Sequence, residues 1–149
     1  MRAHSLAVAV FLLATPAIAA DIGLIKVSAG TVHIERAGAK VKAEVGSGVQ
    51  ASDVLHTGAD GSAGVTFTDN SLMSIGPNTI FAINKYQFDS TTHAGEFDGT
   101  LKQGRLAAVS GKMVKQSPES MKIRTPSAVM GVRGTEFVVQ VDEPVAASR

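Results

Sequence analysis

Apolar residues in this sequence recur in short alternating runs separated by glycine, asparagine and aspartate, and this pattern most constrains the fold. No window of about a dozen residues has the apolar stripe at 3.6-residue spacing that an amphipathic helix needs. Alternation places every second side chain on one face of a strand, so each run predicts a half-buried strand. We therefore expect a single all-β domain whose short strands form a solenoid-like stack, a roll or a sandwich.

The clearest hairpin lies at residues 63–75, where AGVTF and SLMSI flank an Asp69-Asn70 turn. Asparagine tolerates the left-handed backbone that tight hairpins require. TVHIE at residues 31–35 and TIFAINKYQF at residues 79–88 also alternate as strands. Residues 92–99, THAGEFDG, resemble a loop, and residues 99–113 predict two further short strands around Gly104.

The first twenty residues have the pattern of a secretory signal. Arg2 precedes an apolar run from Leu6 to Leu13, and Ala17-Ile18-Ala19 suits signal peptidase. That run is too short for a membrane span, which needs roughly 20 apolar residues. We expect a cleaved signal at residues 1–20, a β domain at residues 21–141 and a frayed tail at residues 142–149, with no transmembrane anchor.

Charge and cysteine content narrow the location and the partners. Without Arg2 the 14 basic residues become 13, equal to the 13 acidic ones, so no basic footprint for nucleic acid is expected. The chain has no cysteine, although exported proteins commonly carry disulfides. A signal without cysteine predicts a protein of the bacterial periplasm or cell surface.

The closing stretch, residues 123–137, predicts a strand, a glycine-hinged irregularity and a second strand. Pro126 lacks an N–H and interrupts any ladder, while Gly131 and Gly134 permit a bulge or kink. Arg133, between these glycines, can present its planar guanidinium to a carboxylate, either that of Glu136 or one on a partner. The arginine thus fixes the kink or recognises a partner.

This stretch resembles the closing motif of FecR-type domains, a T-P-x-x-x-x-x-V-x-G-T-x-F pattern that includes Gly134 and Thr135. Further landmarks occur in order between Ala29 and Val139: Asp53 to Gly58, Gly61 to Leu72, Gly76 to Thr79, and Leu101 to Gly104. Ser52 and Asn70 stand where the family usually has glycine. The resemblance implies an all-β periplasmic module. In the best-known members this module belongs to a membrane-spanning anti-sigma regulator, whose cytosolic segment and membrane helix we do not expect here.

No catalytic, metal or cofactor constellation is expected. Gly46-x-Gly48-x-x-Ala51 fits a dinucleotide motif in form, but no helix is predicted to follow it. His33, His56 and His93 lie in separate segments without paired ligand spacing, and His33 is expected to pair with Glu35. No serine lies in a G-x-S-x-G elbow. The sequence therefore predicts a non-enzymatic protein without a cofactor.

Two functions remain open from the sequence. The first is an exported FecR-like signalling module that binds an envelope protein or a cell-envelope polymer through an exposed strand edge. The alternative is a sensor of a small ligand or carbohydrate, with polar loops near Asp53, His56 and Asn78 as its site. A single tyrosine and no tryptophan argue against sugar stacking. A hydrolase assembled from separated residues is a weaker third possibility.

Overall fold

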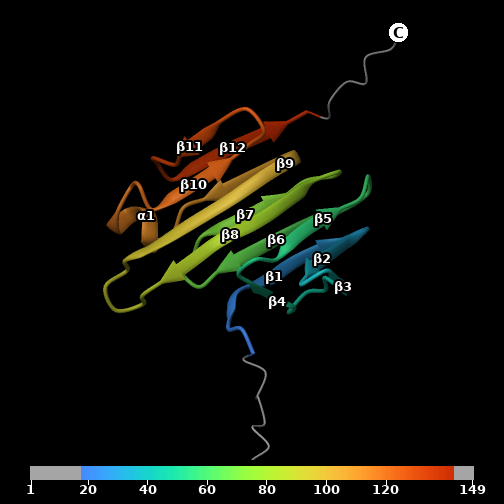
Figure 1. The fold of residues 1–149 in the computed structure, drawn as a ribbon, viewed down its shortest axis with the longest axis horizontal. Helices are drawn as coiled ribbons and strands as arrows, with labels where there is room; N and C mark the ends of the chain where they lie inside the picture. The colour runs from blue at the N-terminus through green and yellow to red at the C-terminus, as the bar shows by residue number, and fades with distance from the viewer. Residues whose placement is uncertain (1–17, 143–149) are drawn as a thin grey trace, which may run out of the picture.

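The computed structural model describes residues 18–142. Most of the predicted signal and all but the first residue of the predicted tail lie outside this range. The prediction of an all-β fold is confirmed, because the described chain folds as one curled, mostly antiparallel sheet (Figure 1). Its first strands are β1 (Asp21–Ala29), β2 (Val32–Arg36), β3 (Ala39–Lys42), β4 (Gly48–Gln50), β5 (Val54–Thr57) and β6 (Ser62–Phe67). They are followed by β7 (Leu72–Ile75), β8 (Ile80–Phe88), β9 (Gly95–Val109), β10 (Met121–Arg124), β11 (Val129–Gly131) and β12 (Glu136–Val141).

The strand β9 joins the two halves of the sheet. Its first part pairs with β8 and, in parallel, with β10, and its second part pairs with β7 and β12. The strand order is β3-β2-β5-β8-β9-β7-β6-β1-β4, and the sheet curls into a half-barrel. The turn between β1 and β2 brings the two ends of this order together. The described strands therefore form one continuous curled sheet.

The prediction of a loop at residues 92–99 is wrong from Gly95 onward, and the prediction of two short strands around Gly104 is also wrong. Residues 95–109 form one continuous strand of 15 residues. Gly104 has a positive φ of 92°, and a Cβ there would lie 2.2 Å from Thr79 Oγ1, so it bends the strand without ending it. Phe97, in the predicted loop, is fully buried. The turn residues 91–94 end before the strand begins.

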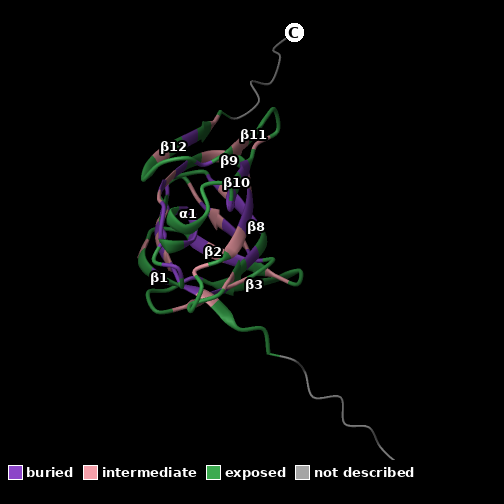
Figure 2. Ribbon diagram, turned by 90° about the vertical axis from the view of Figure 1, so that its left-hand side faces the viewer, coloured by how far each residue is buried: buried purple, intermediate pink, exposed green. Residues whose placement is uncertain are grey.

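Aromatic side chains form the centre of the core between the two halves of the curled sheet. Phe97 packs edge-on against Phe67 and Tyr86, with ring centroids 5.2 and 5.7 Å apart. The sequence did not predict the short helix α1 (Lys112–Gln116), which lies at one end of the curled sheet (Figure 2). It buries the side chains of Met113 and Val114. Five residues are too few to show helical periodicity in a sequence.

The hairpin predicted at residues 63–75 is confirmed as β6 and β7, with Asn70 at a φ of 66°. Asp69 is buried there and accepts hydrogen bonds from the backbone N–H and hydroxyl of Ser71, at 3.0 and 2.7 Å. The Tyr86 hydroxyl also donates to Asp69, at 3.3 Å. Burial raises the pKa of Tyr86 to about 12, so the phenol stays a donor at neutral pH. The turn is thereby fixed to the core.

Candidate functional site at the seam between β11 and β12

The closing stretch forms a hairpin followed by a crossing segment. The strands β10 and β11 pair in antiparallel, and their turn is closed by hydrogen bonds between Thr125 and Ala128, with N–H to C=O at 2.8 Å. Pro126 lies in this turn, where its missing N–H costs no ladder bond. Residues 132–135 then cross to β12, which pairs with β9. The predicted order of strand, hinge and strand is observed.

The crossing segment is fixed by backbone hydrogen bonds. Val132 N–H donates to Met121 C=O at 3.0 Å. The hydroxyl of Ser110 donates to Gly134 C=O at 2.6 Å, and its N–H donates to Thr135 C=O at 2.7 Å. Gly134 has a φ of 120°, a conformation that side chains disfavour, whereas a Cβ at Gly131 would meet nothing and its φ is not positive. Of the two predicted hinge glycines, only Gly134 is required by its backbone.

Two strand edges are left open beside this segment. Within residues 18–142, β11 pairs only with β10 and β12 pairs only with β9. Between these edges lies a pocket of about 160 Å³, here called the seam. Apolar side chains dominate its lining: Ile123, Met130, Val132, Phe137, Val138 and Val139, with Arg133 also present. Open backbone edges beside an apolar pocket are the elements that a binding strand uses.

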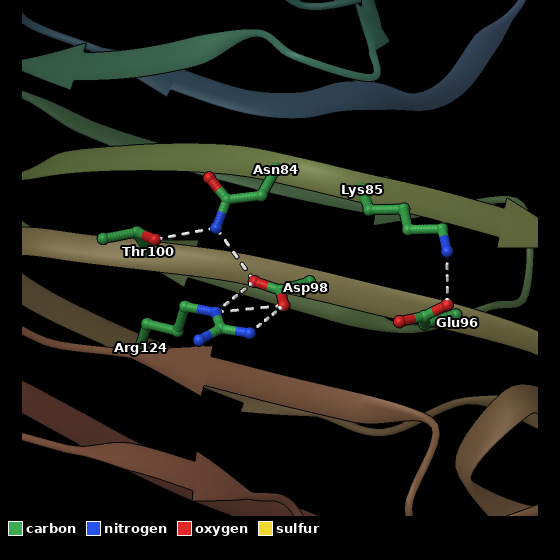
Figure 3. Close-up of polar contacts among 6 residues, drawn as sticks. All are labelled: Asn84, Lys85, Glu96, Asp98, Thr100 and Arg124. Carbon is green, nitrogen blue, oxygen red and sulfur yellow. Dashed lines mark hydrogen bonds and ion pairs between the residues drawn. The ribbon is translucent and has the colours of Figure 1, made fainter.

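A clamp on the outer surface holds the first strand of this region (Figure 3). Arg124 on β10 donates from Nε to both oxygens of Asp98 on β9, at 2.9 and 3.0 Å, and from a terminal nitrogen to Oδ2 at 2.8 Å. Asn84 on β8 donates to Asp98 Oδ1 at 2.8 Å. The clamp ties β8, β9 and β10 together across the parallel pair. The Arg124 guanidinium lowers the pKa of Asp98, which favours the ionised carboxylate.

Arg133 lies near a carboxylate that the sequence analysis did not consider. Its guanidinium lies 3.8 Å from Glu119, and both side chains are about four-fifths exposed, at 79% and 81%. Glu136 lies on β12 opposite Val109 and is also exposed. Of the two carboxylates considered for Arg133, that of Glu136 is therefore not its neighbour in the structure, and the alternative of a carboxylate on a partner stays a prediction. An ion pair at this distance and exposure contributes little, so the guanidinium remains accessible to another carboxylate.

The three residues of the predicted ligand loop lie in different surroundings. Asp53 is buried and accepts from Arg36 Nε and a terminal nitrogen, at 2.8 and 2.7 Å, and from Gln50 N–H at 2.8 Å. His56 lies within β5 rather than in a turn. Asn78 lines another pocket, with Arg105 and Gln140. The Asp53 carboxylate joins β2, β4 and β5 and is not presented to a ligand.

The expected pair between His33 and Glu35 is also wrong. Glu35 contacts His56 across the strands, with Nε2 and Oε2 at 3.2 Å, and the ring of His33 stacks on that of His56 at 4.7 Å. His33 and His56 are directly opposed in the register of β2 and β5, and Glu35 reaches His56 as a diagonal neighbour on the same face. Within residues 18–142, no group of histidines and carboxylates is placed to hold a metal ion.

Sequence reasoning missed Arg36 and the Asp98 clamp. Arg36 ends a strand and gives no sign of its partner, which lies 17 residues later. Asp98 was placed in a loop because acidic residues and glycines surround it. The contacts of both residues depend on which strands become neighbours, and spacing along the chain carries no signal for that.

The fold and the seam define an all-β module with two open strand edges within residues 18–142. Its sequence matches the family model described as "FecR protein" over residues 53–148, well over half of the chain. The protein belongs to the FecR family. The match begins at β5, so β1 to β4 precede it, although the resemblance seen in the sequence began at Ala29. No curated protein and no solved structure gave a match.

A FecR domain indicates a module related to envelope signalling. None of the helical structure in residues 18–142 has the length and apolar character needed to cross a membrane.

Proposed function

We propose that this protein is an exported, non-enzymatic FecR module that binds a protein partner in the periplasm by strand addition along β12. The observation that carries this proposal is the open edge of β12 beside the apolar seam. A partner strand would gain main-chain hydrogen bonds from the edge and specificity from side chains in the seam.

The register of β12 indicates which of its backbone groups face the partner. The N–H of Ser110 donates to Thr135 C=O, so these residues form a hydrogen-bonded pair with β9. Such pairs alternate along an antiparallel ladder, and the groups of residues 136, 138 and 140 therefore point away from β9. A partner strand would pair with these three residues.

Arg133 supports the same mode of binding. It lines the seam and is mostly exposed, and its only ion pair within residues 18–142 is the distant one with Glu119. We propose that it forms a bidentate ion pair with a carboxylate of the partner, which would set the orientation of the added strand. The family's link to envelope signalling makes a protein the favoured partner over an envelope polymer.

The test is crosslinking in cells that produce the tagged protein, followed by mass spectrometry of the captured proteins. Gln140→Pro removes an N–H that points away from β9, so it blocks strand addition without breaking the ladder to β9. Gln140→Thr is the matched control because it keeps the N–H. We expect one dominant partner with the wild type and with Gln140→Thr, loss of that partner with Gln140→Pro, and weaker capture with Arg133→Ala.

Unfolding midpoints close to that of the wild type would show that the variants fold. Equal capture by Gln140→Pro and the wild type would contradict strand addition. The absence of any captured protein would contradict the binding function itself.

A further inference from the structure

A pair of stacked histidines on the outer face of β2 and β5 takes no part in the binding site proposed above. His33 and His56 are directly opposed in the register of these strands. Their rings lie parallel, with 5° between the ring planes and 4.7 Å between the centroids. Glu35, on the same face, places its Oε2 3.2 Å from Nε2 of His56. Two side chains of the type that titrates near neutral pH are therefore held in contact.

One nitrogen of this pair has no partner. Nδ1 of His33 is the only buried side-chain nitrogen or oxygen in residues 18–142 that makes no hydrogen bond. A neutral imidazole has one N–H and one lone pair, so the cost is smaller when Nδ1 carries the lone pair. A charged imidazolium has two N–H groups, and the one at Nδ1 would be a buried donor without an acceptor. The local geometry therefore keeps His33 neutral while the surrounding strands stay in place.

The face around His33 carries more positive than negative charge. Four groups that are charged or can become charged surround it: Lys40 and Lys42 from β3, Glu35 from β2 and His56 from β5. From β8, the residue opposite His56 is the apolar Ile80. Lys42 is paired with Glu44 at 2.6 Å, whereas Glu35 points to His56. A second proton on the histidine pair would therefore meet two lysines and a single nearby carboxylate that the first ring already contacts.

These surroundings lower the pKa of His33. Desolvation by burial contributes most, followed by the positive charges of Lys40 and His56, whereas the negative charge of Glu35 acts in the opposite direction. A histidine with a lowered pKa in the folded state stabilises the fold above the unfolded value of about 6.5. This stabilisation is lost as the pH falls below that value, because the unfolded or opened chain binds the proton more readily.

The edge strand β3 is the element that can move to relieve this cost. All four of its residues are exposed, and within residues 18–142 it pairs only with β2. The chain is fixed on both sides of it: Arg36 is bonded to Asp53, and the hydroxyl of Ser28 donates to Ala43 C=O at 2.7 Å. Movement of residues 37–42 would open the β3 side of His33 to water and separate the lysines from the histidines without opening the core.

We propose that β3 is a pH-dependent cover on the edge of β2, and that mild acid releases it. At neutral pH the histidine pair holds at most one proton, next to Glu35, and β3 stays paired. When the pair takes up a second proton, two imidazolium rings 4.7 Å apart repel each other and the lysines of β3. Release of β3 lets water accept from Nδ1 of His33 and leaves the backbone edge of β2 unpaired, independently of the edge of β12.

The first test follows backbone amide hydrogen exchange by NMR at pH 7 and pH 5, with each rate divided by the intrinsic rate at that pH. In the wild type, opening of the amides paired between β2 and β3 should increase by up to about thirtyfold. This is the factor by which a water-exposed histidine with a pKa of about 6.5 favours its charged form at pH 5. Amides of β9 and β12 should keep their protection, because carboxylates titrate mainly below this range.

Three variants assign the response to the pair. His33→Phe keeps a ring against His56 but takes up no proton, so the protection of β3 should be equal at the two pH values. Lys40→Gln removes one charge that lowers the pKa of His33, so its response should be smaller than that of the wild type. His93→Gln is the matched control because His93 lies outside the pair, in the turn before β9, and it should retain the wild-type response. Circular dichroism would show that each variant folds.

A titration of the histidine ring protons of the wild type needs no substitution and keeps the proposal testable if His33→Phe does not fold. The ring of His33 should stay neutral as the pH falls past about 6.5. Protonation of His33 at or above this value would overturn the proposal. An equal response in the wild type and His33→Phe would also overturn it, as would a loss of protection spread over the whole sheet, which would indicate global destabilisation rather than release of β3.

Discussion

Arg36 and Arg133 both lie near a carboxylate. Arg36 lies at the junction of β2, β4 and β5, whereas Arg133 lies in the exposed segment that crosses to β12. Arg36 makes two short bonds to the buried Asp53 and a third, at 2.9 Å, to Gly48 C=O. Among the described residues, Arg133 has one ion pair, at 3.8 Å with the exposed Glu119. The first guanidinium is satisfied within the protein, and the second retains most of its donors for a partner.

This difference shows that an arginine near a carboxylate can serve the fold or a partner, and that the residue types alone do not indicate which. An arginine whose carboxylate is buried and bonded from several strands contributes to the fold, because loss of either group leaves the other unpaired. An exposed arginine with a distant partner contributes little to stability, so its role has to be sought in recognition. Function in this protein is therefore expected where the ion pairs are loose.

Replacement of Asp53 by alanine should give the largest effect. The substitution removes the acceptor for Arg36 and for Gln50 N–H, and we expect a loss of about 3 kcal/mol in the free energy of unfolding. Urea denaturation followed by circular dichroism measures this value. Glu119→Ala, at the loose pair, is the control and should leave the midpoint unchanged. Similar losses for both variants would remove the distinction between the two regions.

The hinge glycines should give an intermediate effect and sharpen the comparison within the crossing segment. Gly134→Ala forces a side chain into a backbone conformation at a φ of 120°, so we expect a loss of about 1–3 kcal/mol. Gly131→Ala should be nearly neutral, because its added methyl group meets no atom within 4 Å. Thermal unfolding of both variants tests this. An equal loss at Gly131 would show that the crossing segment is strained as a whole.

Much of the fold followed from local pattern. The alternation of Val65 and Phe67 and the Asp69-Asn70 turn predicted a hairpin that the structure contains, because such signals act over a few residues. The continuous strand β9 was not predicted from the sequence. Gly104 was interpreted as a break between two strands, whereas in the structure it lies inside one strand with a positive φ. A left-handed glycine inside a strand and one in a loop look alike in a sequence.

The candidate site was predicted only in part. The sequence located the kink around Arg133, but the seam depends on β12 pairing with the far half of β9, and no residue of the closing stretch specifies that pairing. The same reason explains why Glu119 was not considered as a neighbour of Arg133, whereas Glu136, three residues away, was one of the alternatives. Contacts between residues close in sequence were favoured, whereas the sheet places other residues side by side.

The Asp98 clamp is an intermediate case, and its pH dependence should be the smallest effect. Arg124 lowers the pKa of Asp98, and Asn84 and Lys122 act in the same direction. A depressed pKa in the folded state means that the stabilisation is complete above the unfolded value of about 3.9 and is lost as the pH falls through the folded value.

Asp98→Asn removes this titration while keeping the shape of the side chain. At neutral pH we expect the wild type to be more stable than Asp98→Asn by about 1–2 kcal/mol. The difference should shrink as the pH falls from about 5 toward about 2, because protonation gives the wild type a neutral group as well. Urea unfolding of both proteins at several pH values measures the difference directly and cancels the titration of the other carboxylates. A constant difference over this range would mean that Asp98 stabilises β10 through shape and not through charge. The Asp98–Arg124 ion pair would then contribute as little to stability as the exposed pair of Arg133 and Glu119.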